Sequence, residues 1–221
     1  QFYFYITKGK NRVISKSELL GRLAFCGFEL VDEITIEGKF YFISKKKKTV
    51  SKENSPSYGP IVKLKRIGYK GEFLNIYKLR TMYPYSEFIQ GDIYEKYHLD
   101  KSGKMKGDYR VTSWGKIFRK YFIDEIPQLY NWLKGDINLV GVRALSEHYF
   151  GLYPTDLQRK RVTFKPGLVP PYYADLPKSF DEIIESERRY LIQKERSPIN
   201  TDLKYFSKAI RNILFGARSK W

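Results

Sequence analysis

The sequence contains very little cysteine and histidine, the residues on which cross-links and many metal sites depend. Its 221 residues include one cysteine and two histidines. A single thiol cannot form an internal disulfide, and it suits a reducing compartment. We therefore expect Cys26 to be a buried apolar residue. His98 and His148 have no partners at metal-ligand spacing, so we assign no site to them.

Long apolar runs are also missing. No stretch approaches the roughly 18 consecutive apolar residues of a membrane-spanning helix, and no secretory signal peptide is visible. The chain begins with Gln1 rather than Met, which indicates a fragment or a processed product. A membrane segment ahead of residue 1 therefore stays open.

Acidic residues are scarce beside basic ones. The chain has 41 Lys and Arg against 24 Asp and Glu, a net charge of +17. Such a balance favours a polyanionic partner, which is a nucleic acid, a phosphorylated substrate or an anionic membrane surface. No recognised nucleic-acid module is present, so we predict no nucleic-acid partner. Hydrophobic residues make up 42% of the chain, which indicates a globular protein.

The residue pattern predicts a mixed α+β fold in two parts. Residues 1–54 form a small N-terminal α/β module, with a helix over 15–25, a hairpin that turns at Glu37-Gly38, and a polar linker over 45–54. Residues 55–221 form a helix-rich domain that opens with a hairpin of strands at 61–67 and 73–80. Its predicted helices cover 84–97, 113–121, 146–158, 180–195 and 202–215. We expect short hairpins and no parallel β-α-β succession.

Two basic segments each allow two interpretations. The run Lys45–Lys48 is either a solvated face or a segment attracted to an anionic membrane surface. The last helix carries apolar residues along one side, and these either face the core or lie at a membrane interface. They are Leu203, Phe206, Ile210, Ile213 and Leu214.

The stretch 119–143 holds two adjacent carboxylates, Asp124 and Glu125, among several cations. Four apolar residues that recur at i, i+3, i+4 and i+7 predict one face of a short helix: Ile126, Leu129, Tyr130 and Leu133. Pro127 suits the first turn of this helix and Gly135 its end. The acids would then lie where backbone N–H groups and the helix dipole favour anions. An isolated pair of this kind is more often a helix cap than a catalytic pair, so the pattern alone decides neither.

Five motifs follow one another along the chain. They are Lys78-Leu-Arg80-Thr81-Met82, Asp108-Tyr-Arg110-Val-Thr-Ser-Trp-Gly115, Arg119-x4-Asp124-Glu125-Ile-Pro127, Val140-Gly141-x-Arg143 and Lys165-Pro166-Gly167. In this order they resemble the bacterial sugar transferases of the monotopic phosphoglycosyl transferase class. The resemblance covers residues 56–215 or so and leaves out the N-terminal module.

The resemblance implies an activity. Family members transfer a sugar-1-phosphate from a UDP-sugar to undecaprenyl phosphate, which begins an O-antigen, capsule or exopolysaccharide unit. They work at the cytoplasmic face of the bacterial inner membrane, so the implied partners are the UDP-sugar, undecaprenyl phosphate and the anionic membrane surface. A homo-oligomer is an open alternative to a monomer.

The resemblance also implies roles for particular residues. Asp124 matches the nucleophile, which forms a covalent phospho-sugar intermediate and releases UMP, and Glu125 matches the acid that is tied to a Mg²⁺ cofactor. Substrate and phosphate binding is implied for Lys78, Arg80, Arg119, Arg143, Asp108 and Arg110.

These residue types suit the implied chemistry. A carboxylate that attacks a pyrophosphate must be ionised, and it needs nearby cations to spread the phosphoryl charge. Asp124 among arginines should stay ionised, because opposite charges favour the charged form. Arginine forks match phosphate geometry, and Mg²⁺ takes one or two carboxylates together with substrate phosphate oxygens.

The chain departs from the family pattern at two places. Val142-Arg143-Ala144 stands where the family has Pro-Arg-Pro, and the polar linker over 45–54 stands where family members carry a hydrophobic re-entrant helix. Membrane engagement must then come from upstream segments, the basic surface or the terminal helix. The departures motivate an alternative function, a non-catalytic scaffold or interaction protein of a glycan-assembly pathway.

Overall fold

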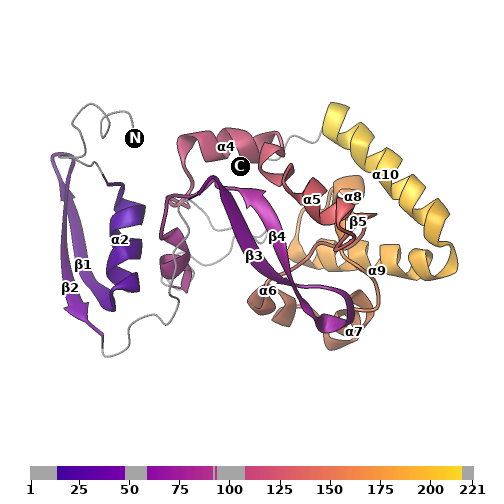
Figure 1. The fold of residues 1–221 in the computed structure, drawn as a ribbon, viewed down its shortest axis with the longest axis horizontal. Coiled ribbons are helices and arrows are strands. Elements are labelled where there is room, and N and C mark those ends of the chain that lie inside the picture. Colours follow the sequence, from indigo (N-terminus) through magenta and orange to yellow (C-terminus); the bar gives the residue numbers. More distant parts are fainter. Residues whose placement is uncertain (1–13, 48–58, 92, 94–107, 216–221) are drawn as a thin grey trace. The chain divides into compact units, whose positions relative to one another are not determined.

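The computed structural model describes residues 14–47, 59–91, 93 and 108–215. They form two compact units of helices and short two-stranded sheets (Figure 1), which confirms the mixed α+β class. One unit comprises residues 1–59, 81–98 and 105–113, and the other comprises residues 60–80, 99–104 and 114–221, within the described limits. The predicted boundary between residues 54 and 55 lies outside the described residues, and so does His98.

The first unit contains the predicted N-terminal helix and hairpin. Helix α2 covers Lys16–Phe25, and Ser15 caps it by accepting a hydrogen bond from the Glu18 N–H at 3.1 Å. Strands β1 (Phe28–Ile36) and β2 (Lys39–Lys46) pair antiparallel. Glu37 and Gly38 both have positive φ, as a tight two-residue hairpin turn requires. Both predicted elements are therefore confirmed.

Two expectations for this unit need correction. Cys26 is exposed, not buried, because it follows the last residue of α2 at the point where the chain turns toward β1. The predicted helix over 84–97 begins as a 3₁₀ turn, η2 (Ser86–Ile89), which packs against α2, and residues 94–97 lie outside the described part of the chain.

The second unit opens with a hairpin that presents a lysine to the interior. Strands β3 (Ile61–Ile67) and β4 (Phe73–Leu79) pair antiparallel, with Val62 opposite Lys78. The 3₁₀ turn η1 (Tyr69–Gly71) joins them. Because side chains alternate along a strand, Lys78 shares a face with the buried Ile76.

The remaining elements are mostly short helices. In chain order they are α4 (Ser113–Lys120), η3 (Ile123–Glu125), α5 (Gln128–Leu133), β5 (Asn138–Val140), α6 (Glu147–Gly151), α7 (Thr155–Arg161), β6 (Gly167–Val169), α8 (Tyr172–Asp175), α9 (Phe180–Arg196) and α10 (Pro198–Phe215). The helix predicted over 146–158 is in fact two, because Pro154 lacks the N–H that a continuous helix needs there. No helix of the described chain is long and apolar enough to cross a membrane.

Strands β5 and β6 pair in parallel, and α6 and α7 lie in the connection between them. The expectation of no parallel β-α-β succession was therefore wrong. Each strand has only three residues, too few for an apolar run to be recognised in the sequence. At this pair the two backbones approach so closely that a Cβ on Gly167 would lie 2.0 Å from the Gly141 nitrogen.

The core of the second unit lies between β5 and the long helices. Its members include Val140, Leu157, Tyr190, Leu191 and Ala209. Helix α8 packs against both α9 and α10 (Figure 1). This core supports the elements that carry the charged residues described below.

Helix α5 turns its apolar side outward. The four residues of its predicted apolar face are exposed, with Leu133 at 77%, whereas Gln128 and Asn131 are buried. In α4, Trp114 and Ile117 are exposed in the same way. The predicted helix is confirmed for Leu129, Tyr130 and Leu133, whereas Ile126 precedes α5, and the apolar stripe does not cover the core.

We predict that Gly167→Ala lowers the free energy of unfolding by roughly 3 kcal/mol, because a methyl group there forces β5 and β6 apart. The matched control is Gly151→Ala at the end of α6, where a Cβ meets nothing within 4 Å. Gly151→Ala should change stability by less than about 0.5 kcal/mol. Urea unfolding of both variants measures the difference, and equal stabilities would contradict the close strand contact.

Candidate active site

Lys78 brings the hairpin into contact with the two adjacent carboxylates. Its Nζ lies 2.6 Å from Oε1 of Glu125 and 3.5 Å from Oδ2 of Asp124. The exposed fractions of these side chains are 15%, 12% and 9%, so all three are largely withdrawn from water. Ion pairs in such surroundings are screened far less than pairs on the surface.

The carboxylates lie in a 3₁₀ turn, not in the first turn of α5. The turn η3 begins after Phe122, which has a φ of +58°, and α5 starts only at Gln128. The Glu125 N–H donates to the Phe122 carbonyl at 3.1 Å, within the turn itself. Side-chain cations, and not free N–H groups of a helix, therefore balance the charge of Glu125.

Asn131 locks α5 onto β4 next to Lys78. It is fully buried, its Oδ1 accepts from the Tyr77 N–H at 3.0 Å, and its Nδ2 donates to the Asn75 carbonyl at 2.8 Å. Asp136 accepts a second bond from the same Nδ2 at 3.1 Å. These bonds fix the position of the acid-bearing turn relative to Lys78.

Arg143 approaches Glu125 from a second direction. Its Nη2 donates to Oε1 of Glu125 at 3.0 Å, and its Nη1 donates to the Tyr172 hydroxyl at 2.6 Å. The Tyr173 hydroxyl lies 3.5 Å from Oε2 of Glu125. One carboxylate oxygen is thus shared by two cations.

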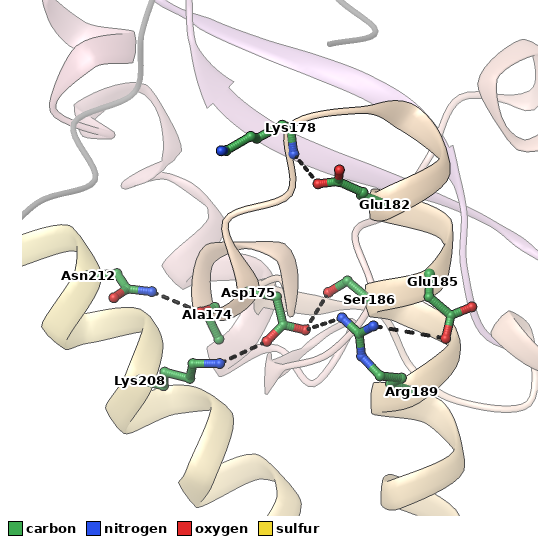
Figure 2. Close-up of polar contacts among 9 residues, drawn as sticks. All are labelled: Ala174, Asp175, Lys178, Glu182, Glu185, Ser186, Arg189, Lys208 and Asn212. Carbon is green, nitrogen blue, oxygen red and sulfur yellow. Dashed lines mark hydrogen bonds and ion pairs between the residues drawn. The ribbon is translucent and has the colours of Figure 1, made fainter. Parts of the chain in front are cut away.

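Asp175 anchors helix α8, which carries both tyrosines, to the neighbouring helices. Figure 2 shows Ser186 and Arg189 of α9 and Lys208 of α10 directed at this carboxylate. Ser186 Oγ donates at 2.8 Å, Lys208 Nζ at 3.0 Å and Arg189 Nη2 at 3.4 Å. Asp175 therefore ties α8 to two long helices.

The charges shift one another's proton affinities. Burial by itself would raise the pKa of the Glu125 carboxyl, but Arg143 and Lys78 outweigh it and hold this pKa below its usual value. Burial, and then the charge of Arg143, lower the pKa of the Lys78 amine despite the attraction of both acids. Glu125 is consequently ionised at neutral pH.

Two carboxylate oxygens of the site are open to a hard cation. Within the described part of the chain, Asp124 Oδ1 forms no hydrogen bond or ion pair, and Glu125 Oε2 has only the 3.5 Å contact with Tyr173. No cluster of three or more His, Cys, Asp or Glu side chains suited to a metal occurs among the described residues. The two open oxygens of Asp124 and Glu125 suit Mg²⁺, because this ion commonly takes one or two carboxylates together with phosphate oxygens of the substrate.

The other predicted site residues belong to other segments of the chain. Arg80 directly follows β4, and its N–H donates to the Pro60 carbonyl at 2.6 Å. Arg119 lies in the last turn of α4, half-buried. Asp108 and Arg110 belong to the first unit, where the guanidinium binds both carboxylate oxygens at 2.8 and 2.7 Å. The structure thus brings together Lys78, Asp124, Glu125 and Arg143.

Sequence reasoning missed the two tyrosines and one arginine. Nothing in Pro170-Pro171-Tyr172-Tyr173 indicates contact with residues 29 to 48 positions earlier. Arg66 could have been found, because it lies on the same face of the hairpin as Lys78. Burial and the nearby charge of Arg143 lower the pKa of Arg66 to about 10.

Comparisons with known proteins agree with the expected family. A family model described as bacterial sugar transferase matches residues 49–216. The galactosyl transferase CpsE of Streptococcus agalactiae serotype III is 32% identical over 177 residues, which cover 77% of this chain and 37% of that protein. The UDP-N-acetylgalactosamine-undecaprenyl-phosphate N-acetylgalactosaminephosphotransferase of Aeromonas hydrophila is 33% identical over 173 residues, 73% of this chain and 38% of that protein.

A third relative matches a shorter part of the chain. The undecaprenyl-phosphate galactose phosphotransferase of Salmonella typhimurium is 35% identical over 108 residues, 47% of this chain and 22% of that protein. The chain therefore spans less than two fifths of the length of each of these three relatives.

Lys78→Met should raise the pKa of Glu125. Burial raises this pKa, and in the variant only Arg143 would remain to lower it. NMR titration of protein with ¹³C-labelled glutamate carboxyls measures this pKa, and Glu125→Gln assigns the signal. Lys63→Met, an exposed residue of the same hairpin, is the control and should leave the pKa unchanged. An unchanged pKa in Lys78→Met would contradict the assigned ion pair.

Proposed function

The chain belongs to the bacterial sugar transferase family, and we propose that it transfers a sugar-1-phosphate from a UDP-sugar to undecaprenyl phosphate. One observation carries the proposal: Asp124 and Glu125 are adjacent, largely buried carboxylates that meet fixed cations. Lys78 contacts both acids, and Arg143 contacts Glu125. The names of two relatives include this acceptor and a phosphotransferase activity, which supports the same substrate class. The product would begin an exopolysaccharide, capsule or O-antigen unit.

In the first half-reaction Asp124 acts as the nucleophile. A carboxylate oxygen of Asp124 attacks the phosphorus that carries the sugar, and the bond from this phosphorus to the bridging oxygen breaks. UMP leaves with the bridging oxygen and its electron pair, and the sugar phosphate stays on Asp124 as an acyl phosphate. Of the two acids, Asp124 suits this role better, because it makes one long contact with Lys78 while Glu125 is held at close range by two cations.

In the second half-reaction the acceptor takes the nucleophilic part. A phosphate oxygen of undecaprenyl phosphate attacks the same phosphorus, the bond to Asp124 breaks, and the carboxylate is regenerated. The product is undecaprenyl diphosphate sugar. Donor and acceptor can thus react at one site in turn, a ping-pong scheme.

The cations of the site supply electrostatic stabilisation. Both half-reactions bring an anion toward a phosphorus whose oxygens already carry negative charge, and fixed positive groups lower that repulsion. Lys78 and Arg143 are held in place by Glu125, so they need little reorganisation when the substrate arrives. Arg66, on the same face of the hairpin, adds positive charge at the edge of this group.

We further propose Mg²⁺ as the cofactor. Glu125, with Asp124 beside it, would hold the ion through the open oxygens described above. When bound, Mg²⁺ supplies charge neutralisation on the phosphate oxygens of the donor.

The outward apolar side of α4 and α5 suits an anionic membrane surface. Trp114, Ile117, Ile126, Leu129 and Leu133 are exposed, and they lie on both sides of the acidic pair in the sequence. Lysines accompany them at 116, 120 and 134. Exposed apolar residues flanked by lysines are typical of segments that lie in the headgroup region. This would bring Asp124 close to a lipid-borne phosphate at the cytoplasmic face of the inner membrane.

The scaffold alternative makes a different prediction. It is motivated by Val142 and Ala144 in place of two prolines and by the polar linker in place of a re-entrant helix. A scaffold would bind glycan-assembly partners without turnover. Release of UMP that requires undecaprenyl phosphate in detergent would eliminate it.

Asp124→Asn should abolish catalysis. We expect radiolabel from the sugar of the donor to appear on the protein in the absence of acceptor and to vanish in this variant. UMP release should fall by at least about three orders of magnitude, because an amide cannot replace the nucleophile. The exposed Asp181→Asn in α9 is the control and should keep both signals. Stable labelling of Asp124→Asn would contradict the assignment.

The double variant Trp114→Glu, Leu133→Glu should bind anionic vesicles roughly tenfold more weakly, because two apolar side chains no longer enter the interface. Co-sedimentation with phosphatidylglycerol vesicles measures the affinity. Ile34→Glu, exposed in β1 of the first unit, serves as the control. Equal vesicle binding by the double variant and by Ile34→Glu would contradict the proposal that α4 and α5 face the membrane.

A further inference from the structure

Arg143 lies on a short piece of backbone between two points that are held by backbone hydrogen bonds. Before it, the Gly167 N–H donates to the Val142 carbonyl at 3.0 Å; after it, the Ile67 N–H donates to the Leu145 carbonyl at 2.9 Å. Between these points the Arg143 carbonyl accepts a bond from a side chain, Nη2 of Arg161, at 2.5 Å. Neither Val142 nor Ala144 restricts the backbone as a proline would.

Arg161 is itself rigidly held. It lies at the end of α7 with only 4% of its side chain exposed, and it forms an ion pair with Glu187 of α9, which is completely buried. Its guanidinium also lies over the Tyr153 ring, 4.6 Å from the centroid. A planar guanidinium can bind a carboxylate and a carbonyl at once in fixed directions, which a lysine amine cannot do.

Stability alone does not explain this arrangement. Burying two charges is costly, and a buried ion pair can often be replaced by apolar residues of similar volume without loss of stability. What an apolar pair cannot supply is a donor for the Arg143 carbonyl. The pair thus supplies the Arg143 backbone with a hydrogen bond that packing alone would not give.

We propose that Arg161, held by Glu187, is a positioning residue that directs the Arg143 guanidinium at Glu125. The inference rests on the proposed function, because it is through the transfer reaction that the position of Arg143 becomes measurable. Arg161 touches no substrate in this scheme. It acts through the backbone of Arg143, in place of the rigidity that prolines on either side would give.

A mutant cycle on the full chain tests the proposal. The double variant Arg161→Met, Glu187→Leu removes both buried charges together and retains an apolar core. It is made in the parent chain and in an Arg143→Ala background, and circular dichroism confirms folding. UMP release is measured with undecaprenyl phosphate in detergent, using whichever of UDP-galactose and UDP-N-acetylgalactosamine the parent chain turns over faster. Arg159→Met, exposed on the same helix, is the matched control.

In the parent background kcat should fall on the order of 10- to 100-fold, since small misplacements of a charged group are costly in catalysis. In the Arg143→Ala background the same double substitution should change kcat by less than about twofold, because there is no guanidinium left to direct. Arg159→Met should leave kcat unchanged in both backgrounds.

Equal fold losses in both backgrounds, or full activity of the double variant in the parent chain, would overturn the proposal. If the double variant does not fold, Arg161→Lys replaces it in the same cycle. Arg161→Lys keeps a positive charge opposite Glu187 but loses the planar guanidinium. Equal fold losses in both backgrounds, or full activity in the parent chain, would again overturn the proposal. A parent chain that turns over neither donor refutes the proposed function, and this inference falls with it; an active parent with an additive cycle refutes the inference alone.

Discussion

The site depends on one electrostatic constraint, the largely withdrawn carboxylate of Glu125 between Lys78 and Arg143. An ionised carboxylate removed from water is costly unless cations and hydrogen bonds compensate it. Here the two cations come from β4 and from the loop after β5, which are far apart in sequence. Folding must therefore bring hairpin, acidic turn and arginine loop together before Glu125 can be buried as an anion. The same contacts leave Asp124 with one longer contact to the same lysine.

Three polar residues, of which Asn131 and Arg161 are buried and Asp175 is partly buried, connect the elements of the site. Asn131 joins α5 to β4 at Tyr77, the neighbour of Lys78. Arg161 holds the Arg143 carbonyl, and Asp175 fastens the short helix that carries Tyr172 and Tyr173. Each connects residues that belong to different elements. Directed polar bonds thus complement the apolar core in holding these elements together.

Much of the fold follows from local signals. Ser15, Glu37-Gly38 and the alternation in β3 and β4 predict elements that the structure contains, because caps and turns act over a few residues. Non-local features could not be predicted in this way. The parallel pairing of three-residue strands, the exposure of Cys26 and the outward face of α5 depend on what packs nearby in space. A helical period identifies an apolar stripe, but it does not tell whether the protein core or a membrane covers that stripe.

The residues of the candidate site likewise fall into those that local motifs predict and those that depend on tertiary contacts. The ordered motifs predict Lys78, Asp124, Glu125 and Arg143 as site residues, and the structure brings these four together. The motifs do not include Tyr172, Tyr173 or Arg161, which reach the site only through tertiary contacts. A crystal structure with UDP and Mn²⁺ in place of Mg²⁺ would test whether Asp124 is placed to act as the nucleophile. If Asp124 is the nucleophile, we expect the phosphorus farther from the uridine to lie about 3–4 Å from one of its carboxylate oxygens, which is near-attack distance. The Mn²⁺ anomalous signal should then lie beside Glu125. A diphosphate bound elsewhere on the second unit, with Asp124 facing no phosphorus, would contradict this role.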